Sequence, residues 1–254
     1  MTVRRVLITG SSSGIGAATA ILLAEQGYAV WITYTSGKAA AHEVAARCRA
    51  AGAAKVHVSP LDLRSPTAIY ALVAEVTGSW GELHVLVNNG GVCPYQGYDE
   101  ISIDDWDGVM ETNGRGTFLL SRACLPLLRA AEANTPGIDR VIINLSSVAG
   151  QVGAITTGMH YAASKGAILA ITRSFARILA SERIRVNAVT PGPITSAITD
   201  NLSEAARTSL EQTIPLGHFG EPEDVAWVIS GLASPQARFV TGVTYDVNGG
   251  TRID

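Results

Sequence analysis

Short runs of hydrophobic, largely β-branched residues recur along the 254-residue chain, at intervals that leave room for a helix between them. Most runs are hydrophobic at every position rather than at alternate positions, which is typical of parallel strands covered on both faces. The pattern predicts seven strands, at residues 6–9, 30–34, 56–59, 85–88, 141–145, 186–189 and 243–247.

Segments with helical periodicity separate these runs. They span residues 14–26, 38–52, 66–79, 104–132, 158–181 and 222–233. Regular alternation of strands and helices predicts an α/β fold of the Rossmann type, a doubly wound and mostly parallel seven-stranded sheet with helices on both faces. Because no linker-like stretch or charge run divides the chain, we expect one dinucleotide-binding and catalytic domain over residues 1–254.

Composition narrows the class of protein. The 19 basic and 22 acidic side chains leave a net charge of −3, and no basic cluster exceeds Arg4 and Arg5, so we expect no nucleic-acid partner. No hydrophobic run approaches membrane-spanning length, and a strand begins within five residues of the N-terminus, which leaves no room for a signal peptide. We therefore expect a soluble, cytoplasmic protein with no membrane partner.

The cysteines and histidines show no metal-ligand spacing, so no metal site is predicted. The three cysteines are odd in number and widely spaced, which favours free thiols over disulfides. These residues are Cys48, Cys93 and Cys124, and the histidines stand at positions 42, 57, 84, 160 and 218.

Polar residues, glycines and a proline follow the predicted strands directly. In a doubly wound sheet, ligands bind beyond the carboxyl ends of the strands, so these positions predict a binding crevice. The positions are Gly10, Tyr34 to Ser36, Asp62 and Leu63, Asn88 to Gly91, Ser146 and Ser147, and Pro191 and Gly192.

The stretch "TGSSSGIG" at residues 9–16 fits two motifs. In the G-x-S-x-G nucleophile elbow, Ser12 would be an attacking hydroxyl, but that motif needs an oxyanion hole from an earlier strand and only eight residues precede Gly10. In a glycine-rich dinucleotide cradle, Gly10 permits a tight turn, Gly14 close backbone approach and Gly16 close helix packing, so phosphate meets the helix N-terminus. We favour the cradle.

Tyr161 and Lys165 are four residues apart and share one face of a predicted helix. Ser147 follows a strand, fourteen residues earlier, so a chain that leaves the sheet there and returns as this helix can bring both hydroxyls together. Reduction of a ketone by hydride builds negative charge on its oxygen, which needs hydrogen-bond donors and a proton. Tyr161 can supply the proton and Ser147 a second hydrogen bond.

A cation would help this tyrosine, since a free phenol has a pKa of about 10. An ammonium about 4 Å away is worth roughly 4 kcal/mol at an effective dielectric constant near 20, which lowers a phenol pKa by about three before desolvation opposes it. We therefore expect Lys165 to bring the pKa of Tyr161 near working pH.

In their order and spacing these motifs resemble those of the classical short-chain dehydrogenase/reductase family, over essentially the whole chain. The matching residues are Thr9-Gly10-x-x-x-Gly14-Ile15-Gly16, Asp62-Leu63, Asn88-Asn89-Gly90-Gly91, Asn113, Ser147, Tyr161-x-x-x-Lys165 and Pro191-Gly192. The stretches "HFGEPEDVA" from His218 and "VNGG" near the C-terminus are most similar to those of 3-oxoacyl thioester reductases. The family usually has alanine where Gly90 stands.

The resemblance implies roles for these residues. It implies that Asn113, Ser147, Tyr161 and Lys165 are catalytic, with Lys165 also holding the nicotinamide ribose and Asn113 anchoring a water. It implies that Asp62 accepts a hydrogen bond from adenine, and that a substrate lid spans about residues 193–215. The implied cofactor-binding residues are Gly10, Ser12, Ser13, Gly14, Ile15, Gly16, Tyr34, Thr35, Ser36, Asp62, Leu63, Asn89, Gly90, Gly91, Tyr161, Lys165, Pro191, Gly192, Ile194 and Ser196.

The end of the second strand bears on cofactor choice. An NAD-preferring site places an acid there to bind the ribose 2′-hydroxyl, and that acid repels a 2′-phosphate. Here Tyr34, Thr35 and Ser36 occupy the position and Lys38 follows, so NADP(H) is favoured and NAD(H) remains an alternative. Against this, Ser13 stands where many NADP-binding members carry arginine or lysine.

Several roles remain open at this stage. Residues 93–96 either line the substrate entrance or are loop residues without a role, and His160 is interpreted as a pocket-wall or surface residue. The helices at 104–132 and 158–181 are too hydrophobic for two solvated faces, and the family pairs such helices between subunits, which implies a homotetramer.

The predicted activity is reduction of a ketone or oxidation of a secondary alcohol. A 3-oxoacyl thioester is the first substrate considered, and a polyketide, sugar or cyclic ketone the alternative. Two other classes are weighed against this reading. A dinucleotide-sensing protein without catalysis would not need Ser147, Tyr161 and Lys165 together, and a serine hydrolase would depend on Ser12.

Overall fold

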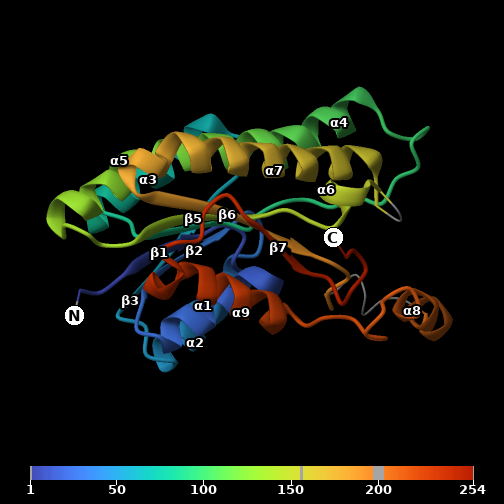
Figure 1. Cartoon of the computed structure of the whole chain (residues 1–254), viewed down its shortest axis with the longest axis horizontal. Coiled ribbons are helices and arrows are strands. Elements are labelled where there is room, and N and C mark those ends of the chain that lie inside the picture. Colours follow the sequence, from blue (N-terminus) through green and yellow to red (C-terminus); the bar gives the residue numbers. More distant parts are fainter. Residues whose placement is uncertain (1, 155–156, 197–202, 254) are drawn as a thin grey trace.

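A twisted sheet lies between two layers of helices (Figure 1). The computed structural model describes residues 2–154, 157–196 and 203–253. The described strands follow the order β3-β2-β1-β4-β5-β6-β7, and every pairing between them is parallel. The predicted doubly wound sheet is therefore confirmed, with no antiparallel pair among these strands. Their bounds are β1 Arg5–Ile8, β2 Ala29–Tyr34, β3 Lys55–Pro60, β4 Val85–Asn88, β5 Arg140–Leu145, β6 Ile184–Pro191 and β7 Thr244–Val247.

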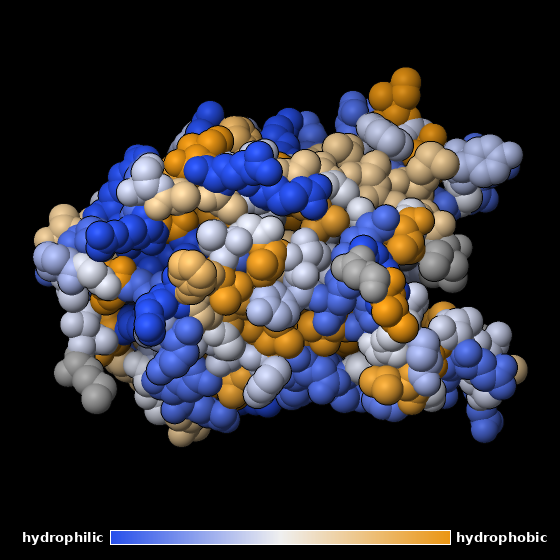
Figure 2. Space-filling view, viewed as in Figure 1, coloured by the Kyte–Doolittle hydropathy of each residue, from blue (hydrophilic) through white to orange (hydrophobic). Residues whose placement is uncertain are grey.

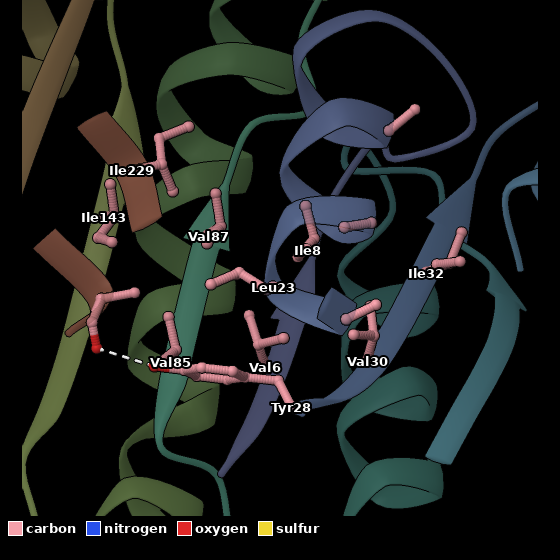
Figure 3. Packing of buried hydrophobic residues seen from close by; sticks show 14 of the residues in the cluster. Val6, Ile8, Leu23, Tyr28, Val30, Ile32, Val85, Val87, Ile143 and Ile229 are labelled. Carbon is pink, nitrogen blue, oxygen red and sulfur yellow. Dashed lines mark hydrogen bonds between the residues drawn. The ribbon is translucent and has the colours of Figure 1, made fainter. Parts of the chain in front are cut away.

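Alternate residues of the central strands face different helical layers. Val6 and Ile8 of β1 pack with Leu23 on one side, and Leu7 packs with Leu128 on the other. Figure 3 shows the first cluster, where the Tyr28 hydroxyl also donates a hydrogen bond to the Ala233 carbonyl at 3.3 Å. The first layer holds α1 (Gly14–Glu25), α2 (Lys38–Ala50) and α9 (Pro222–Ala233), and the second holds α3 (Pro66–Trp80), α5 (Gly116–Asn134) and α7 (Met159–Leu179).

The predicted helix at 104–132 is interrupted. It consists of α4 (Ile103–Val109), a π-helical segment η1 (Met110–Arg115) and α5. The side chain of Ser102 and the carboxylate of Asp105 form a capping box at the start of α4, which fixes its first turn. Hydrophobic periodicity does not reveal a single π turn, because the flanking helical segments dominate the pattern.

Among the residues that the structure describes, four short elements lie outside the predicted helices or at their ends. They are α6 (Ala149–Val152), η2 (Ala180–Glu182), α8 (Glu204–Glu211) and η4 (Pro235–Ala237). Segments of three to eight residues are too short for periodicity to identify. Among the described residues, no helix combines the length and the hydrophobicity needed to cross a membrane.

Ion pairs cluster at the amino ends of the strands, opposite the carboxyl edge. The guanidinium of Arg185 donates to both carboxylate oxygens of Asp139 at 2.7 Å, and Arg4 lies 3.3 Å from the same carboxylate. Arg185 and Asp139 are 6% and 11% exposed. Their charges are therefore compensated by each other rather than by water.

Replacement of Asp139 by asparagine should lower the free energy of unfolding by about 3 kcal/mol, because a buried guanidinium then loses its counter-charge. Urea denaturation measures the change. The control is Glu182→Gln, which removes the partner of the exposed Arg129 and should cost about 1 kcal/mol or less. Equal losses in the two variants would contradict the assignment of Asp139 to a buried network.

Candidate active site

Two cavities open at the carboxyl edge of the sheet. The first, of about 960 Å³, extends over β1, β2 and β3, and the second, of about 380 Å³, lies beyond β5 and β6. Five residues line both, so the cavities meet at one place: Ile15, Asn89, Gly91, Val92 and Cys93. Because β1 and β4 are neighbours although far apart in sequence, this meeting point is where the strand order reverses.

The loop after β1 approaches the loop after β4 closely. Gly10 has a φ of +59°, and a Cβ on it would lie 2.7 Å from the Cα of Gly90. A Cβ on Gly16 would lie 2.6 Å from the carbonyl oxygen of Gly10. Side chains at these positions would push the first turn of α1 away from the strand.

Hydrogen bonds connect the same two loops. The amide of Asn89 donates to the carbonyls of Thr9 and Gly10 at 2.9 and 3.0 Å, and the backbone N–H of Gly90 donates to the Thr9 hydroxyl at 2.7 Å. The role of the Thr9 hydroxyl was not predicted, since threonine at the end of a strand also suits packing alone.

The first turn of α1 can hold a diphosphate. Ser13 is the N-cap of α1, but its side chain makes no capping hydrogen bond. The first backbone N–H groups of the helix and the positive end of its dipole are therefore available to an anion. Ser12, Ser13 and Ile15 line the first cavity at this point, and the residues present fit a dinucleotide.

The far end of the first cavity is lined by residues after β2 and β3. Thr35, Ser36 and Leu63 line it as predicted, and so does Asp62. The Asp62 carboxylate accepts hydrogen bonds from the backbone and guanidinium of Arg64, and these bonds lower its pKa. Either oxygen can still accept a further bond, because a carboxylate has about four acceptor positions.

Tyr34 differs from the prediction. The sequence places it with Thr35 and Ser36 as a cofactor-binding residue, but its ring packs against the hydrophobic cluster of the first layer and lines neither cavity. The reason is strand alternation, since successive side chains point to opposite faces. Gly14 and Gly16 also lie outside both linings, and they act through the shape of the loop.

The second cavity brings Ser147, Tyr161 and Lys165 together. Ser147 follows β5, and the other two stand one turn apart on α7. The hydroxyls of Ser147 and Tyr161 share a hydrogen bond. The ammonium of Lys165 lies 5.6 Å from the centre of the Tyr161 ring and donates to the carbonyl of Leu145 at 2.8 Å.

Burial controls the ionisation of this group. The pKa of Tyr161 is raised above 10, mainly by burial and then by Cys93, while the hydrogen bond from Ser147 opposes the change. Burial lowers the pKa of Lys165 to about 8. The expectation that Lys165 brings the pKa of Tyr161 near working pH is therefore wrong for this arrangement, because burial dominates and Lys165 is not among the groups that shift this pKa.

Cys93 is a residue of the site that the sequence left undecided. Its thiol forms side-chain hydrogen bonds with the hydroxyls of Tyr161 and Tyr95, and burial raises its pKa. Cys93 and Tyr95 both line the second cavity, so the loop after β4 forms one of its walls. Only the fold could reveal this contact, because Cys93 and Tyr161 stand 68 positions apart without a recognisable pattern.

Asn113 lies in the π-helical segment η1 and is fully buried. Its side-chain oxygen accepts from the N–H of Val92 at 2.9 Å, and its amide donates to the carbonyl of Val92 and the hydroxyl of Ser164, both at 2.9 Å. Asn113 thus ties the loop after β4 to α7. Its side chain lines neither cavity and has protein partners on both polar atoms.

The loop after β6 forms another wall of the second cavity. Pro191, Gly192, Ile194 and Ser196 line it as predicted, and so do the lid residues Leu210 and Thr213. Residues 197–202 of the predicted lid lie outside the described residues. His160 is fully buried in the wall of the first cavity, which agrees with a pocket-wall role.

Lys165→Met should stabilise the protein. A pKa lowered from 10.5 to about 8 means that the folded state disfavours the ammonium. The effect is worth about 3 kcal/mol below pH 8, less about 1 kcal/mol for the lost hydrogen bond, so the free energy of unfolding should rise by about 2 kcal/mol at pH 7.

The gain should shrink as the pH rises from about 8 to 10.5, because the unfolded chain then also loses its proton. Urea denaturation at pH 7 and pH 10 measures both effects. Lys55→Met, at an exposed position, is the control and should change stability by less than about 0.5 kcal/mol. A Lys165→Met protein less stable than the parent at pH 7 would contradict the burial argument.

Comparisons with known proteins identify the family of the chain. A family model described as Enoyl-(Acyl carrier protein) reductase matches residues 10–252. The chain is 37% identical over 249 residues to the 3-oxoacyl-[acyl-carrier-protein] reductase FabG of Staphylococcus aureus (strain Mu50), which covers 97% of each chain. It is 36% identical over 250 residues to the enzyme of the same name from Thermotoga maritima, again with 97% of each chain covered.

A solved structure described as a short-chain dehydrogenase/reductase from Burkholderia xenovorans has a TM-score of 0.89 and 31% sequence identity, and the match covers 99% of this chain and 98% of that one. Fold, site geometry and relatives therefore agree. The chain belongs to the short-chain dehydrogenase/reductase family and is a nicotinamide-dependent oxidoreductase.

Proposed function

We propose that this chain is an NADPH-dependent reductase of 3-oxoacyl thioesters, working within one catalytic domain whose lid spans about residues 193–215. The convergence of Ser147, Tyr161 and Lys165 in the second cavity, which meets the first one beside them, carries the proposal. The two relatives named above are both 3-oxoacyl reductases, which supports the substrate class.

The cavity walls suit an acyl chain next to a polar reacting group. Hydrophobic residues form much of the second cavity, including Val148, Pro193, Leu210 and Phe219. Ser147 and Tyr161 bring two hydroxyls together in the same cavity. A ketone bound with its oxygen toward these hydroxyls would place its carbon chain against the hydrophobic side.

The residues after β1, β4 and β6 that line the two cavities would hold a reduced nicotinamide cofactor, which when bound would supply the hydride for the carbonyl carbon, with the electron pair of the C=O bond going to oxygen. Tyr161 donates its proton to that oxygen, and Ser147 donates a hydrogen bond that stabilises the growing negative charge. Burial keeps Tyr161 protonated until then. The ammonium of Lys165 stabilises the phenolate that remains.

The first cavity favours NADPH over NADH. Thr35, Ser36 and Gly37 line it after β2, so no carboxylate from that strand end faces the adenosine ribose. A 2′-phosphate meets hydroxyl groups there rather than a like charge. Arg64 lines the same cavity and pairs with Asp62 at 3.0 Å, so a guanidinium is present in this cavity.

We also propose a homotetramer in the cytoplasm. Leu119 and Leu125 on α5 are only half-buried by the chain itself, and Ile178 on α7 is exposed, so this hydrophobic helical surface suits a second copy. The three cysteines are free thiols, which suits a reducing compartment.

Tyr161→Phe should lower the rate of ketone reduction by at least about 100-fold, because the proton donor is lost. Binding of NADPH, measured by titration calorimetry, should change less than about threefold. The measurement of turnover is the decrease in reduced-nicotinamide absorbance with a 3-oxoacyl thioester.

The matched control is Tyr95→Phe, which removes a hydroxyl from the same cavity wall without removing a proton donor to the substrate. Its turnover should stay within about fivefold of the parent. A parent protein that binds NADPH but reduces no ketone would favour a dinucleotide sensor instead. Full activity of Tyr161→Phe would remove the proposed mechanism.

Cofactor choice is tested at Ser36. The parent should show a kcat/KM at least about tenfold higher with NADPH than with NADH, and Ser36→Asp should reduce that ratio by tenfold or more, since its carboxylate repels a 2′-phosphate. The control is Ser36→Asn, because asparagine has nearly the size of aspartate but no charge. This variant should keep the preference for NADPH. Equal rates of the parent with both cofactors would contradict the assignment.

A further inference from the structure

A third cavity, of about 470 Å³, continues the second one toward the surface. Tyr95 and Thr157 line both of them, so a substrate that enters the site can extend into this outer groove. Its walls come from the loop after β4 and the loop before α7. The described residues that line it are Tyr95, Gln96, Gly97, Tyr98, Ala154, Thr157 and Met159.

The outer groove exposes large hydrophobic side chains. Tyr95, Tyr98 and Met159 are 55%, 78% and 56% exposed. Exposed aromatic rings and a methionine at the mouth of a cavity form a surface for stacking and for hydrophobic contact with a ligand. This part of the site therefore favours an uncharged group.

The rim of the groove is negatively charged. Residues 91–101 contain two acidic side chains, Asp99 and Glu100, and no lysine, arginine or histidine. The carboxylate of Glu100 accepts from the N–H of Gly97 at 3.2 Å, and a Cβ on Gly97 would lie 2.9 Å from a carboxylate oxygen of Asp99. Both carboxylates thus lie beside a residue that lines the groove, and both residues are exposed.

No positive charge on the facing wall offsets this rim. Residues 148–164 contain no lysine, arginine, aspartate or glutamate. Arg207, on the lid helix α8, pairs with Glu211 at 3.0 Å. In Figure 2, hydrophobic atoms project at the upper right over α4, beside strongly hydrophilic ones. Within the loop after β4, the rings of Tyr95 and Tyr98 and the carboxylates of Asp99 and Glu100 stand within six residues of one another.

We propose that the outer groove binds the distal part of a free, uncharged carbonyl substrate, and that its acidic rim rejects the same substrate carried on an acidic carrier protein. The inference rests on the proposed reductase function and specifies how the substrate arrives. Like charges facing each other across an interface disfavour binding, and a cleft lined by one sign of charge lowers the local concentration of that charge.

The test compares one 3-oxoacyl chain on three thiols: neutral N-acetylcysteamine, anionic coenzyme A and an acidic acyl carrier protein. At low ionic strength, kcat/KM should fall in that order, by at least tenfold from the first to the last. Added salt should narrow the difference, because the Debye length shortens from about 30 Å at 0.01 M to about 8 Å at 0.15 M.

Charge variants locate the effect. Asp99→Lys combined with Glu100→Lys should raise kcat/KM for the carrier-bound substrate at least tenfold, while turnover of the N-acetylcysteamine thioester stays within twofold. Asp99→Asn with Glu100→Gln keeps the hydrogen-bond acceptor for Gly97 and should give part of that gain. The control, Glu25→Lys with Glu43→Lys on α1 and α2, makes the same change in net charge and should have no effect.

Tyr98→Ala tests the groove itself. It should raise KM for the N-acetylcysteamine thioester at least fivefold and leave kcat within twofold, because the ring contacts only the distal part of the substrate. Tyr70→Ala on α3 removes another exposed tyrosine ring, one that does not line the groove, and should change neither constant. An unchanged KM in Tyr98→Ala would overturn the role of the groove.

A measurement of carrier binding tests this inference independently of the proposed reductase function. Biolayer interferometry with the acidic carrier should show no association with the parent and measurable association with the double lysine variant. Association of the carrier with the parent, or preferred turnover of its substrate, would overturn the proposal. Failure to reduce any thioester would instead count against the proposed function, and the binding result would still decide whether the rim rejects the carrier.

Discussion

The close contact between the loop after β1 and the loop after β4 is the constraint on which the site depends. Parallel strands leave their carboxyl ends at one edge of the sheet. The strand order reverses between β1 and β4, so the loops after these two strands either diverge or pack against each other. Here they interlock, since Asn89 donates to the carbonyls of Thr9 and Gly10, and glycines at positions 10, 16 and 90 leave room for the contact. The first turn of α1 is held beside the strand, and the two cavities meet at this point.

Burial and charge together set the protonation states of Lys165 and Tyr161. Lys165 is 6% exposed and remains mainly an ammonium at neutral pH because its pKa is lowered only to about 8. Tyr161 stays a neutral phenol because burial raises its pKa, and its hydroxyl contacts Ser147 and Cys93. A proton donor that is protonated at rest and lies near a cation suits delivery of a proton to a developing alkoxide. In our proposal, the acidic rim of the outer groove selects among substrates by their charge, away from the residues that react.

Much of the fold follows from sequence because each buried parallel strand is a continuous hydrophobic run, and the site follows because its motifs stand directly after those runs. The rest depends on three-dimensional contacts. The π turn at Asn113 lies inside a long periodic helix, Tyr34 faces the core through strand alternation, and the pKa of Tyr161 depends on burial that no spacing reveals. The Cys93 contact to Tyr161 likewise exists only once the loop after β4 packs against α7.

The most direct measurement is a crystal structure of the chain with NADP⁺ and the alcohol product of a 3-oxoacyl thioester. The account predicts the product oxygen within hydrogen-bond distance of both the Tyr161 and the Ser147 hydroxyls, with the carbinol carbon facing the nicotinamide at the junction of the two cavities. A product oxygen bound away from these hydroxyls, or a nicotinamide that does not reach the junction, would contradict the central claim.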